Sequence, residues 1–408
     1  MATMTGKKRP MPTTTLLLPS SSTSAQRRFW NGLKIFSVLT VLICIIAFTQ
    51  MSQWSSTFDP KTRRSFYYNP VVITGTPKIA FLFLARMDIP LDFLWHVFFQ
   101  NGDVDKFSIY VHSAPGFFLD ESTTRSHYFY GRQLKESVQV MWGEASMIKA
   151  EKLLIKAALE DHLNQRFVLL SDSCIPLYNF TYIYNYMMSS PKSFVDSFFD
   201  AKDERYNPEM YPVISKDKWR KGSQWKTLTR KHAAAVIFDS AIFHVFEEQC
   251  KCLPEDDYEK VENEGKNQTM PDRRPDCIPD EHYVQTLFST YELENELERR
   301  TLTYTCWNQT KDKKNKQGWH PFMFEFSDAN PEQMRKIKVA NHVYYQTEFR
   351  IEWCQNNSTN VPCFLFARKF SKGAAMRLMN DGFVGPYDAK QILSSWRKQP
   401  QTHQGRVA

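Results

Sequence analysis

Several patterns that identify common protein classes are absent from this chain. Its 408 residues show no internal repeat, so repeat architectures are not indicated. Paired Cys-x-x-Cys knuckles are also missing, although structural zinc sites commonly use them. The formal net charge is +8, but part of it lies in the N-terminal tail, and no basic stripe is interleaved with aromatic residues. Nucleic acid is therefore not an expected partner.

The N-terminal segment lacks acidic residues altogether. Residues 1–34 are rich in Thr, Ser and Pro and carry six Lys or Arg, which predicts a disordered basic tail in the cytosol. Residues 35–51 are uncharged and mostly apolar, enough to span roughly 25 Å as a helix. The alternatives are a buried core helix and a cleaved signal peptide. The basic flank argues against the first, and the long N-terminal region without a small-x-small site argues against the second.

Positive charge on the N-terminal side of residues 35–51 predicts a single-pass type II orientation, with everything after residue 52 in the lumen. The short span suits the thinner membranes of the endoplasmic reticulum or Golgi. Tripeptides that accept N-linked glycans begin at Asn179, Asn267, Asn308, Asn356 and Asn357.

Cysteine usage fits an oxidising lumen. Cys44 lies in the anchor, and seven others follow it, so one is left unpaired. We expect Cys174, after an apolar strand, to be the free thiol, and Cys354 and Cys363 to close a short polar loop as a disulfide. Zinc bound by Cys250, Cys252, Cys277 and His282 is the competing interpretation, which their spacing disfavours.

The luminal part alternates short apolar runs with helical patterns. Residues 79–84, 107–112, 167–170 and 233–238 have the composition of strands buried on both faces, and residues 92–100 and 150–162 that of helices. This alternation predicts an α/β fold with a mostly parallel sheet flanked by helices. We assign residues 52–77 to a stem, 78–385 to one luminal catalytic domain, 251–276 within it to a polar loop, and 386–408 to a mobile tail.

The segment Cys277-Ile-Pro-Asp-Glu-His-Tyr is a candidate site for a general base. Pro279 suits the first position of a helix, and the positive end of that helix favours an ionised acid at Glu281 in the first turn. Such a carboxylate can remove a proton from a sugar hydroxyl. An Asp-Glu pair after Pro is also ordinary helix-start composition, so this motif needs support from the rest of the chain.

Taken in order, the luminal chain reads KIAFLFLAR, FSIYVHSAP, VMWGEASMIKAEKLLIKAAL, RFVLLSDSCIPLYNF, SFVDSF, WRKGSQWKTLTRKHA, PDEHYVQT and CFLFARKF. This order resembles the plant branch of the core-2/I-branching β-1,6-N-acetylglucosaminyltransferase family, glycosyltransferase family 14, from Lys78 to Phe370. The resemblance implies an inverting, UDP-sugar-dependent enzyme of the GT-A type in the Golgi. It implies that Glu281 is the general base and that Lys369 contacts the diphosphate, although Lys369 also fits a solvated basic pair with Arg368.

The resemblance further implies that basic side chains replace the usual metal, so we expect no cofactor. The literal Asp-x-Asp match, Asp103-Val-Asp105, precedes a strand and fits a loop, whereas Asp172 follows one but has Cys174 at its partner position. Animal members carry a second phosphate-binding Arg between two cysteines spaced like Cys354 and Cys363. Here that loop has no Arg, which leaves Arg368 and Arg350 as candidates.

Donor contacts are expected where the first strands end, at Ala85, Arg86, His112 and Asp172. His112 equally fits a hydrogen-bonded strand end. By the resemblance, Trp225 and Gln224 run beside the acceptor, where an indole can stack on a sugar. We assign Trp142 to packing, and Arg220 and Lys221 are as well explained by solvation.

Several alternatives stay open at this point. The donor sugar is N-acetylglucosamine by resemblance to animal members or glucuronic acid by analogy with plant ones. A catalytically inactive, membrane-anchored carbohydrate-binding protein is the main rival. A glycoside hydrolase would need two carboxylates at one bond, and we expect Asp280 to point away from Glu281.

Overall fold

The computed structural model describes residues 31, 34–46, 49, 74–201, 205–250, 277–307, 321–356 and 359–382. The chain divides into two units, Met1–Phe66 and Tyr67–Ala408. In the first, residues 34–46 are helical. Within the described ranges, no helix combines the length and the apolar character needed to cross a bilayer. The predicted anchor at residues 35–51 therefore stays a prediction, and most of the predicted stem and the loop at 251–276 lie outside the described residues.

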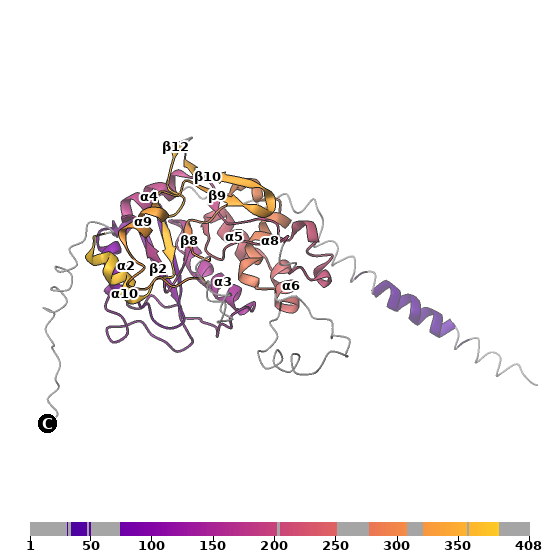
Figure 1. The fold of residues 1–408 in the computed structure, drawn as a ribbon. Coiled ribbons are helices and arrows are strands. Elements are labelled where there is room, and N and C mark those ends of the chain that lie inside the picture. The colour runs from indigo at the N-terminus through magenta and orange to yellow at the C-terminus, as the bar shows by residue number, and fades with distance from the viewer. Residues whose placement is uncertain are drawn as a thin grey trace, which may run out of the picture. The chain divides into compact units, whose positions relative to one another are not determined.

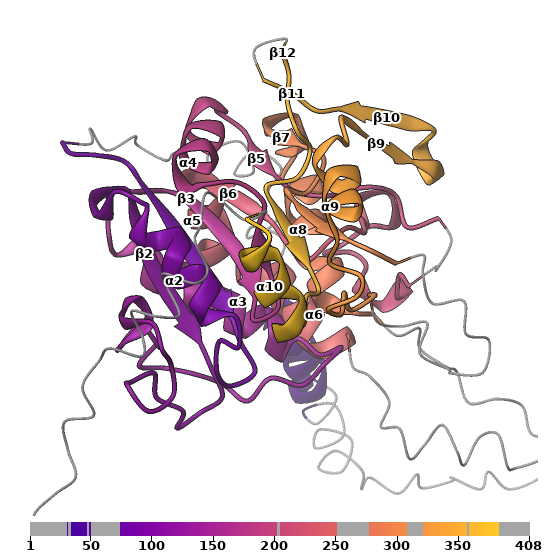
Figure 2. The same cartoon turned by 60° about the vertical axis from the view of Figure 1, so that its left-hand side comes forward.

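The second unit is built on a six-stranded sheet with the order β2-β1-β3-β6-β5-β7 (Figures 1 and 2). The strands are β1 (Lys78–Leu84), β2 (Phe107–His112), β3 (Asn164–Ser171), β5 (Ser193–Phe194), β6 (Thr227–Thr229) and β7 (Leu297–Glu298). β1 pairs in parallel with both β2 and β3, whereas β6 is antiparallel to its neighbours β3 and β5. The predicted mostly parallel sheet is confirmed.

Helices cover both faces of this sheet (Figure 2). The α-helices that the structure describes in this unit are α2 (Asp92–Gln100), α3 (Ser146–Leu159), α4 (Phe180–Ser189), α5 (Arg230–Phe238), α6 (Ala241–Gln249), α8 (Tyr283–Thr290), α9 (Pro331–Lys338) and α10 (Lys372–Asn380). Successive side chains of a strand point to opposite faces. Phe81 and Phe83 of β1 therefore meet Trp95 of α2 at ring-centroid distances of 6.3 and 5.0 Å, while α3 packs on the other face.

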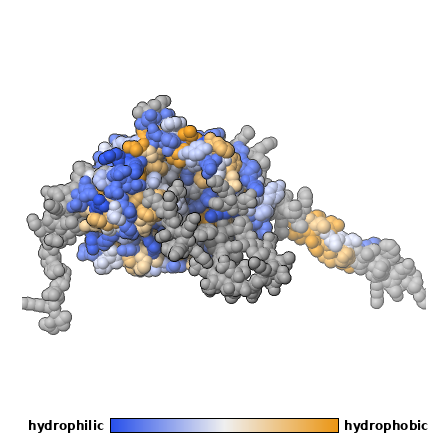
Figure 3. All heavy atoms as spheres, viewed as in Figure 1, coloured by the Kyte–Doolittle hydropathy of each residue, from blue (hydrophilic) through white to orange (hydrophobic). Residues whose placement is uncertain are grey.

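A second sheet joins β4 (Ile175–Pro176), β13 (Phe366–Arg368) and β8 (Thr303–Thr305), with β13 in the middle. Two hairpins pair β9 (His342–Tyr345) with β10 (Arg350–Trp353), and β11 (Gln355–Asn356) with β12 (Thr359–Asn360). In Figure 3, hydrophobic residues interrupt the hydrophilic surface near the β9–β10 hairpin, where Tyr344, Ile351 and Trp353 are exposed.

One predicted strand is wrong. Residues 233–238 belong to helix α5, not to a buried strand. The run of three alanines favours a helix, because alanine has the highest helix propensity. Thr229 also caps the helix, since its hydroxyl accepts the backbone N–H of His232. An apolar run of six residues cannot be assigned by hydrophobicity alone, and here the cap decides the outcome.

The disulfide predicted between Cys354 and Cys363 is present, and Cys174 is a free, buried thiol as expected. Cys306 is free as well. Cys250 is bonded to Cys277, so neither thiol is available to zinc and that alternative is wrong. Of the glycan acceptors, Asn179 is exposed at the N-terminus of α4. Asn267, Asn308 and the side chain of Asn356 lie outside the described residues.

Candidate active site

A cleft of about 1160 Å³ opens where β1, β2 and β3 end at their carboxyl termini. This edge of an open α/β sheet is where ligands usually bind. The predicted donor residues Ala85, Arg86, His112 and Asp172 all line the cleft, and so do the predicted pair Arg368 and Lys369 and the predicted base Glu281. Topology thus brings segments separated by nearly three hundred residues to one site.

His112 forms part of the wall at the end of β2. It is buried, its Nε2 accepts a hydrogen bond from the backbone N–H of Val138 at 3.1 Å, and burial lowers its pKa. A neutral imidazole that accepts at Nε2 carries its proton on Nδ1. That Nδ1 is buried and has no hydrogen-bond partner of good geometry among the described residues.

Arg86 and Asp172 face each other across the ends of β1 and β3, with 3.2 Å between Nε and the carboxylate oxygen. Asp103, by contrast, caps a short 3-10 turn and pairs with Lys106 at 3.1 Å, as the loop interpretation predicts. Among the residues that the structure describes, no three His, Cys, Asp or Glu side chains are grouped to hold a metal ion.

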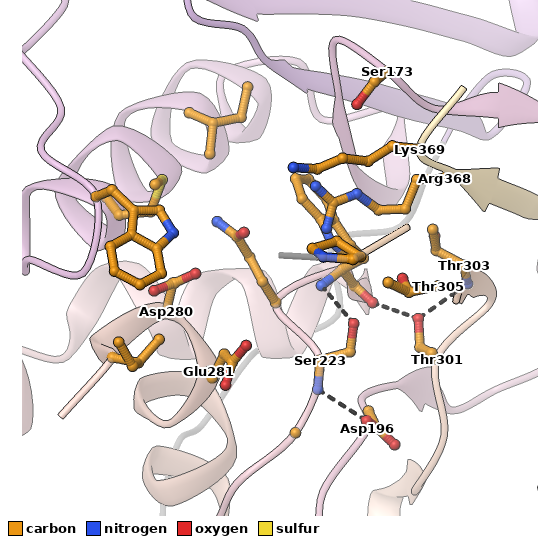
Figure 4. Close-up of a pocket in the computed structure, with 18 of the residues that line it drawn as sticks. Ser173, Asp196, Ser223, Asp280, Glu281, Thr301, Thr303, Thr305, Arg368 and Lys369 are labelled. Atoms are coloured by element: carbon orange, nitrogen blue, oxygen red, sulfur yellow. Dashed lines mark hydrogen bonds between the residues drawn. The ribbon is translucent and has the colours of Figure 1, made fainter. Parts of the chain in front are cut away.

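Two neighbouring cations extend from one wall of the cleft. Figure 4 shows Arg368 and Lys369 side by side, with Asp280 and Glu281 across from them. Burial lowers the pKa of both side chains, and the charges of Arg368 and Arg86 lower that of Lys369 further. An anion bound between them would relieve this repulsion, which makes the pair a natural phosphate site.

Glu281 ends a single 3-10 turn, Pro279–Glu281, and the α-helix α8 begins only at Tyr283. Pro279 occupies the first position of this 3-10 turn and not of α8, so Glu281 does not lie in the first turn of an α-helix as we predicted. Before Pro279, Ile278 adopts a left-handed conformation with φ 41°, which is strained for a β-branched residue. The segment around Gly222 stabilises this turn, because the backbone N–H of Gly222 donates a hydrogen bond to the Glu281 carbonyl at 2.9 Å.

Asp280 does not point away from Glu281, contrary to our expectation. In this tight turn both side chains line the cleft (Figure 4). Burial, followed by the charge of Glu281, raises the pKa of Asp280 to about 7. The site therefore contains one carboxyl that keeps its proton in mildly acidic solution beside the candidate base. Because two carboxyl groups line the cleft, the number of carboxylates does not exclude a glycoside hydrolase.

Lys221 and Arg220 are not simply solvated. Nζ of Lys221 lies 4.0 Å from a Glu281 carboxylate oxygen, with both side chains largely buried, so a positive charge accompanies the candidate base. The guanidinium of Arg220 is paired with Glu294 at 3.0 Å and is buried. His282, once a zinc candidate, stacks on Trp219 and hydrogen bonds the Arg220 carbonyl at 2.8 Å.

The segment predicted to run beside the acceptor forms the floor of the cleft. Gln224 lines the cleft, but its amide donates to Glu151 at 2.8 Å, and Glu151 is also paired with buried Lys226 at 2.7 Å. Trp225 is 5% exposed and has the Arg368 guanidinium over its ring, 4.3 Å from the centroid. That face of the indole is not open to a sugar.

Trp142, which we assigned to packing, is 55% exposed and lines the cleft. Arg350, one of two candidates for the second phosphate cation, does not line the cleft. It is paired with Glu348 at 2.8 Å and with Glu352, and it donates to the Ser197 carbonyl. The geometry therefore favours Arg368 over Arg350.

Two residues of the site were not singled out from the sequence. Asp196, just after β5, lines the cleft, accepts the N–H of Ser223 at 2.9 Å and hydrogen bonds Tyr345. Burial raises the pKa of both side chains. Gly222 packs so tightly on Asp196 that an added Cβ would lie 1.9 Å from the Asp196 carbonyl oxygen. Both lie in the quoted segments SFVDSF and WRKGSQW, but nothing in either segment marked them.

Comparison with known proteins agrees with these motifs. Residues 79–338 match the family model described as "Core-2/I-Branching enzyme". Over 322 residues the chain is 49% identical to a rice protein (Oryza sativa subsp. japonica) named "Glycosyltransferase BC10", an alignment that covers 78% of this chain and 80% of the rice protein. The chain therefore belongs to the core-2/I-branching enzyme family and carries its glycosyltransferase domain on the α/β fold described above.

Proposed function

We propose that this protein is an inverting, UDP-sugar-dependent glycosyltransferase of the GT-A type that modifies a branch point of a glycan. Its family already implies a sugar donor and a glycan acceptor. The observation that carries the finer proposal is the arrangement of charge in the cleft. A carboxylate base, Glu281, faces a pair of cations, Arg368 and Lys369, across a space large enough for a nucleotide sugar.

The proposed reaction is a single displacement. The acceptor oxygen attacks the anomeric carbon of the donor from the side of Glu281, which takes the hydroxyl proton as the new bond forms. The bond between the anomeric carbon and the diphosphate oxygen breaks on the opposite side. Arg368 and Lys369 stabilise the negative charge that develops on the departing UDP, so we expect no metal to be required.

The remaining contacts are assigned by position. We assign the nucleoside to the wall that Ala85, Arg86 and His112 form. The acceptor approaches over the segment from Gly222 to Gln224, next to Glu281. We place the protein in the Golgi as a single-pass type II membrane protein with this domain in the lumen, on the basis of residues 1–51 and the paired cysteines.

The inactive carbohydrate-binding protein remains the rival, and one experiment separates the two. The purified full-length protein is incubated with a panel of UDP-sugars, including those of N-acetylglucosamine and glucuronic acid, and with glycan acceptors, and UDP release is measured with and without excess chelator. We expect acceptor-dependent release with one donor, unchanged by chelator. Glycan binding without release from any donor would support the rival. Activity lost in chelator and restored by manganese would contradict the metal-free mechanism and point to Asp172.

A further inference from the structure

The contact between Trp225 and Arg368 assigns a role to each residue. The central carbon of the Arg368 guanidinium lies over the indole, 4.3 Å from the ring centroid. Arginine stacks in this way because its planar cation is attracted to the negative face of an aromatic ring. Trp225 is 5% exposed, so it belongs to the floor beneath Arg368 rather than to the open surface of the cleft.

Trp225 is a rigid support. Its backbone N–H donates to the Ser223 hydroxyl oxygen at 3.2 Å, and its backbone carbonyl accepts the Thr301 hydroxyl at 2.6 Å (Figure 4). The adjacent Lys226 is buried in an ion pair with Glu151. The backbone on both sides of the indole is therefore fixed by contacts from separate parts of the chain.

Arg368 depends on this support because it has few other fixed contacts. Nε is buried without a hydrogen-bond partner among the described residues. Asp172, Asp280 and Glu281 are near enough to favour the charge of Arg368, but among the described residues none of them forms an ion pair with it. Arg350, in contrast, is held by Glu348 and Glu352. A guanidinium that stacks on a ring and has no paired carboxylate keeps its charge available for a ligand in the cleft.

We propose that Trp225 is a positioning residue for the donor, which holds the Arg368 guanidinium beside Lys369 so that both cations face one diphosphate. The inference rests on the proposed function and deepens it. It also explains how this chain manages without an Arg in the loop between Cys354 and Cys363, because the second cation comes from the residue next to Lys369. Trp225 then serves the donor and not the acceptor.

The test compares UDP with uridine as probes, using calorimetric titration of the full-length protein. Trp225→Leu removes the ring, Trp225→Phe keeps a smaller one, and Arg368→Met removes the charge while keeping the length. We expect Trp225→Leu to weaken UDP binding roughly tenfold, the size of a well-placed cation–π contact, and to leave uridine binding unchanged. Trp225→Phe should lie between wild type and Trp225→Leu.

A double-mutant cycle makes the inference specific. Trp225→Leu should add little to the loss already caused by Arg368→Met, because the ring acts through the guanidinium. UDP affinity equal to wild type in the Trp225 variants, with a raised acceptor KM, would overturn the inference and restore Trp225 to the acceptor. Should Trp225→Leu not fold, Trp225→Phe decides the same question. A wild-type protein that binds no UDP would instead overturn the proposed function, and the inference with it.

Discussion

Replacing Gly222 by alanine tests whether the floor of the cleft positions the base. An alanine Cβ there would lie 1.9 Å from the Asp196 carbonyl oxygen and 2.5 Å from its carbon, both backbone atoms that cannot rotate away. Moving the segment instead would strain four hydrogen bonds. These join Gly222 to Glu281 at 2.9 Å, Ser223 to Asp196 at 2.9 Å, and Lys221 to Phe198 at 2.8 and 2.9 Å.

The expected cost follows from these contacts. Overpacking by one methyl group costs about 1–3 kcal/mol, and each backbone hydrogen bond that is lost costs about 1 kcal/mol. With two bonds lost, Gly222→Ala should lower the free energy of unfolding by about 3–5 kcal/mol, a fall in Tm on the order of 10 °C. Since the Glu281 carbonyl moves with the segment, transfer should fall by roughly 100-fold even in folded protein, as expected for a base displaced by about 1 Å.

Thermal unfolding and UDP release are measured for both variants of a matched pair. The control is Gly373→Ala in helix α10, where the nearest atom to an added Cβ is Phe326 Cβ at an ordinary 3.6 Å. Alanine in a helix should leave Gly373→Ala as stable as wild type or slightly more stable. A Gly222→Ala protein with wild-type Tm and transfer would show that the segment does not hold the base, and would refute the reasoning.

Two further predictions concern protonation. Folding raises the pKa of Asp280 from 3.8 to about 7, so the folded protein keeps a proton that the unfolded chain releases, and stability falls as pH rises between these values. Between pH 5 and 8 this fall is about 3 kcal/mol, at about 1.4 kcal/mol for each pH unit up to pH 7. Urea unfolding at these two pH values should show that Asp280→Asn removes the fall, and an unchanged fall would contradict the burial of Asp280. In the free protein the pKa of Lys369 lies below its usual 10.5, and a bound diphosphate should raise it because it favours the charged amine. UDP should therefore bind with full affinity below the pKa of the free protein, and its affinity should fall as pH rises through that value. UDP affinity of Lys369→Arg should depend less on pH than that of wild type, because arginine stays charged over this range. An equal pH dependence in the two proteins would place the diphosphate elsewhere.

Much of the architecture was predictable because periodicity and composition agreed. The helix at 92–100 and the strands at 79–84 and 107–112 lie where their apolar patterns predicted them. Residues 233–238 were mistaken for a strand because a short apolar run has no period long enough to distinguish the two structures. Only the hydroxyl of Thr229, acting as a cap, and the alanine content separated them.

The site was predictable only where a residue lies in a sequence motif with a known chemical role. Glu281 and Lys369 lie in recognisable motifs, and both reach the cleft. Asp280 was misplaced because we treated it as part of a regular helix, whereas α8 begins only at Tyr283. The orientation of the separate turn that contains Asp280 and Glu281 follows from left-handed Ile278, which no helical period encodes. Gly222 and the stack of Arg368 on Trp225 depend on contacts between segments far apart in sequence, which no local pattern encodes.

The central claim, that Glu281 is the general base, is tested most directly by Glu281→Gln. The amide keeps the shape of the side chain but cannot accept the hydroxyl proton. With the donor and acceptor identified by UDP release, we expect full-length Glu281→Gln to retain the Tm and UDP affinity of wild type, with transfer reduced by roughly 100-fold or more. Turnover within a few-fold of wild type would contradict the account and remove Glu281 from the mechanism.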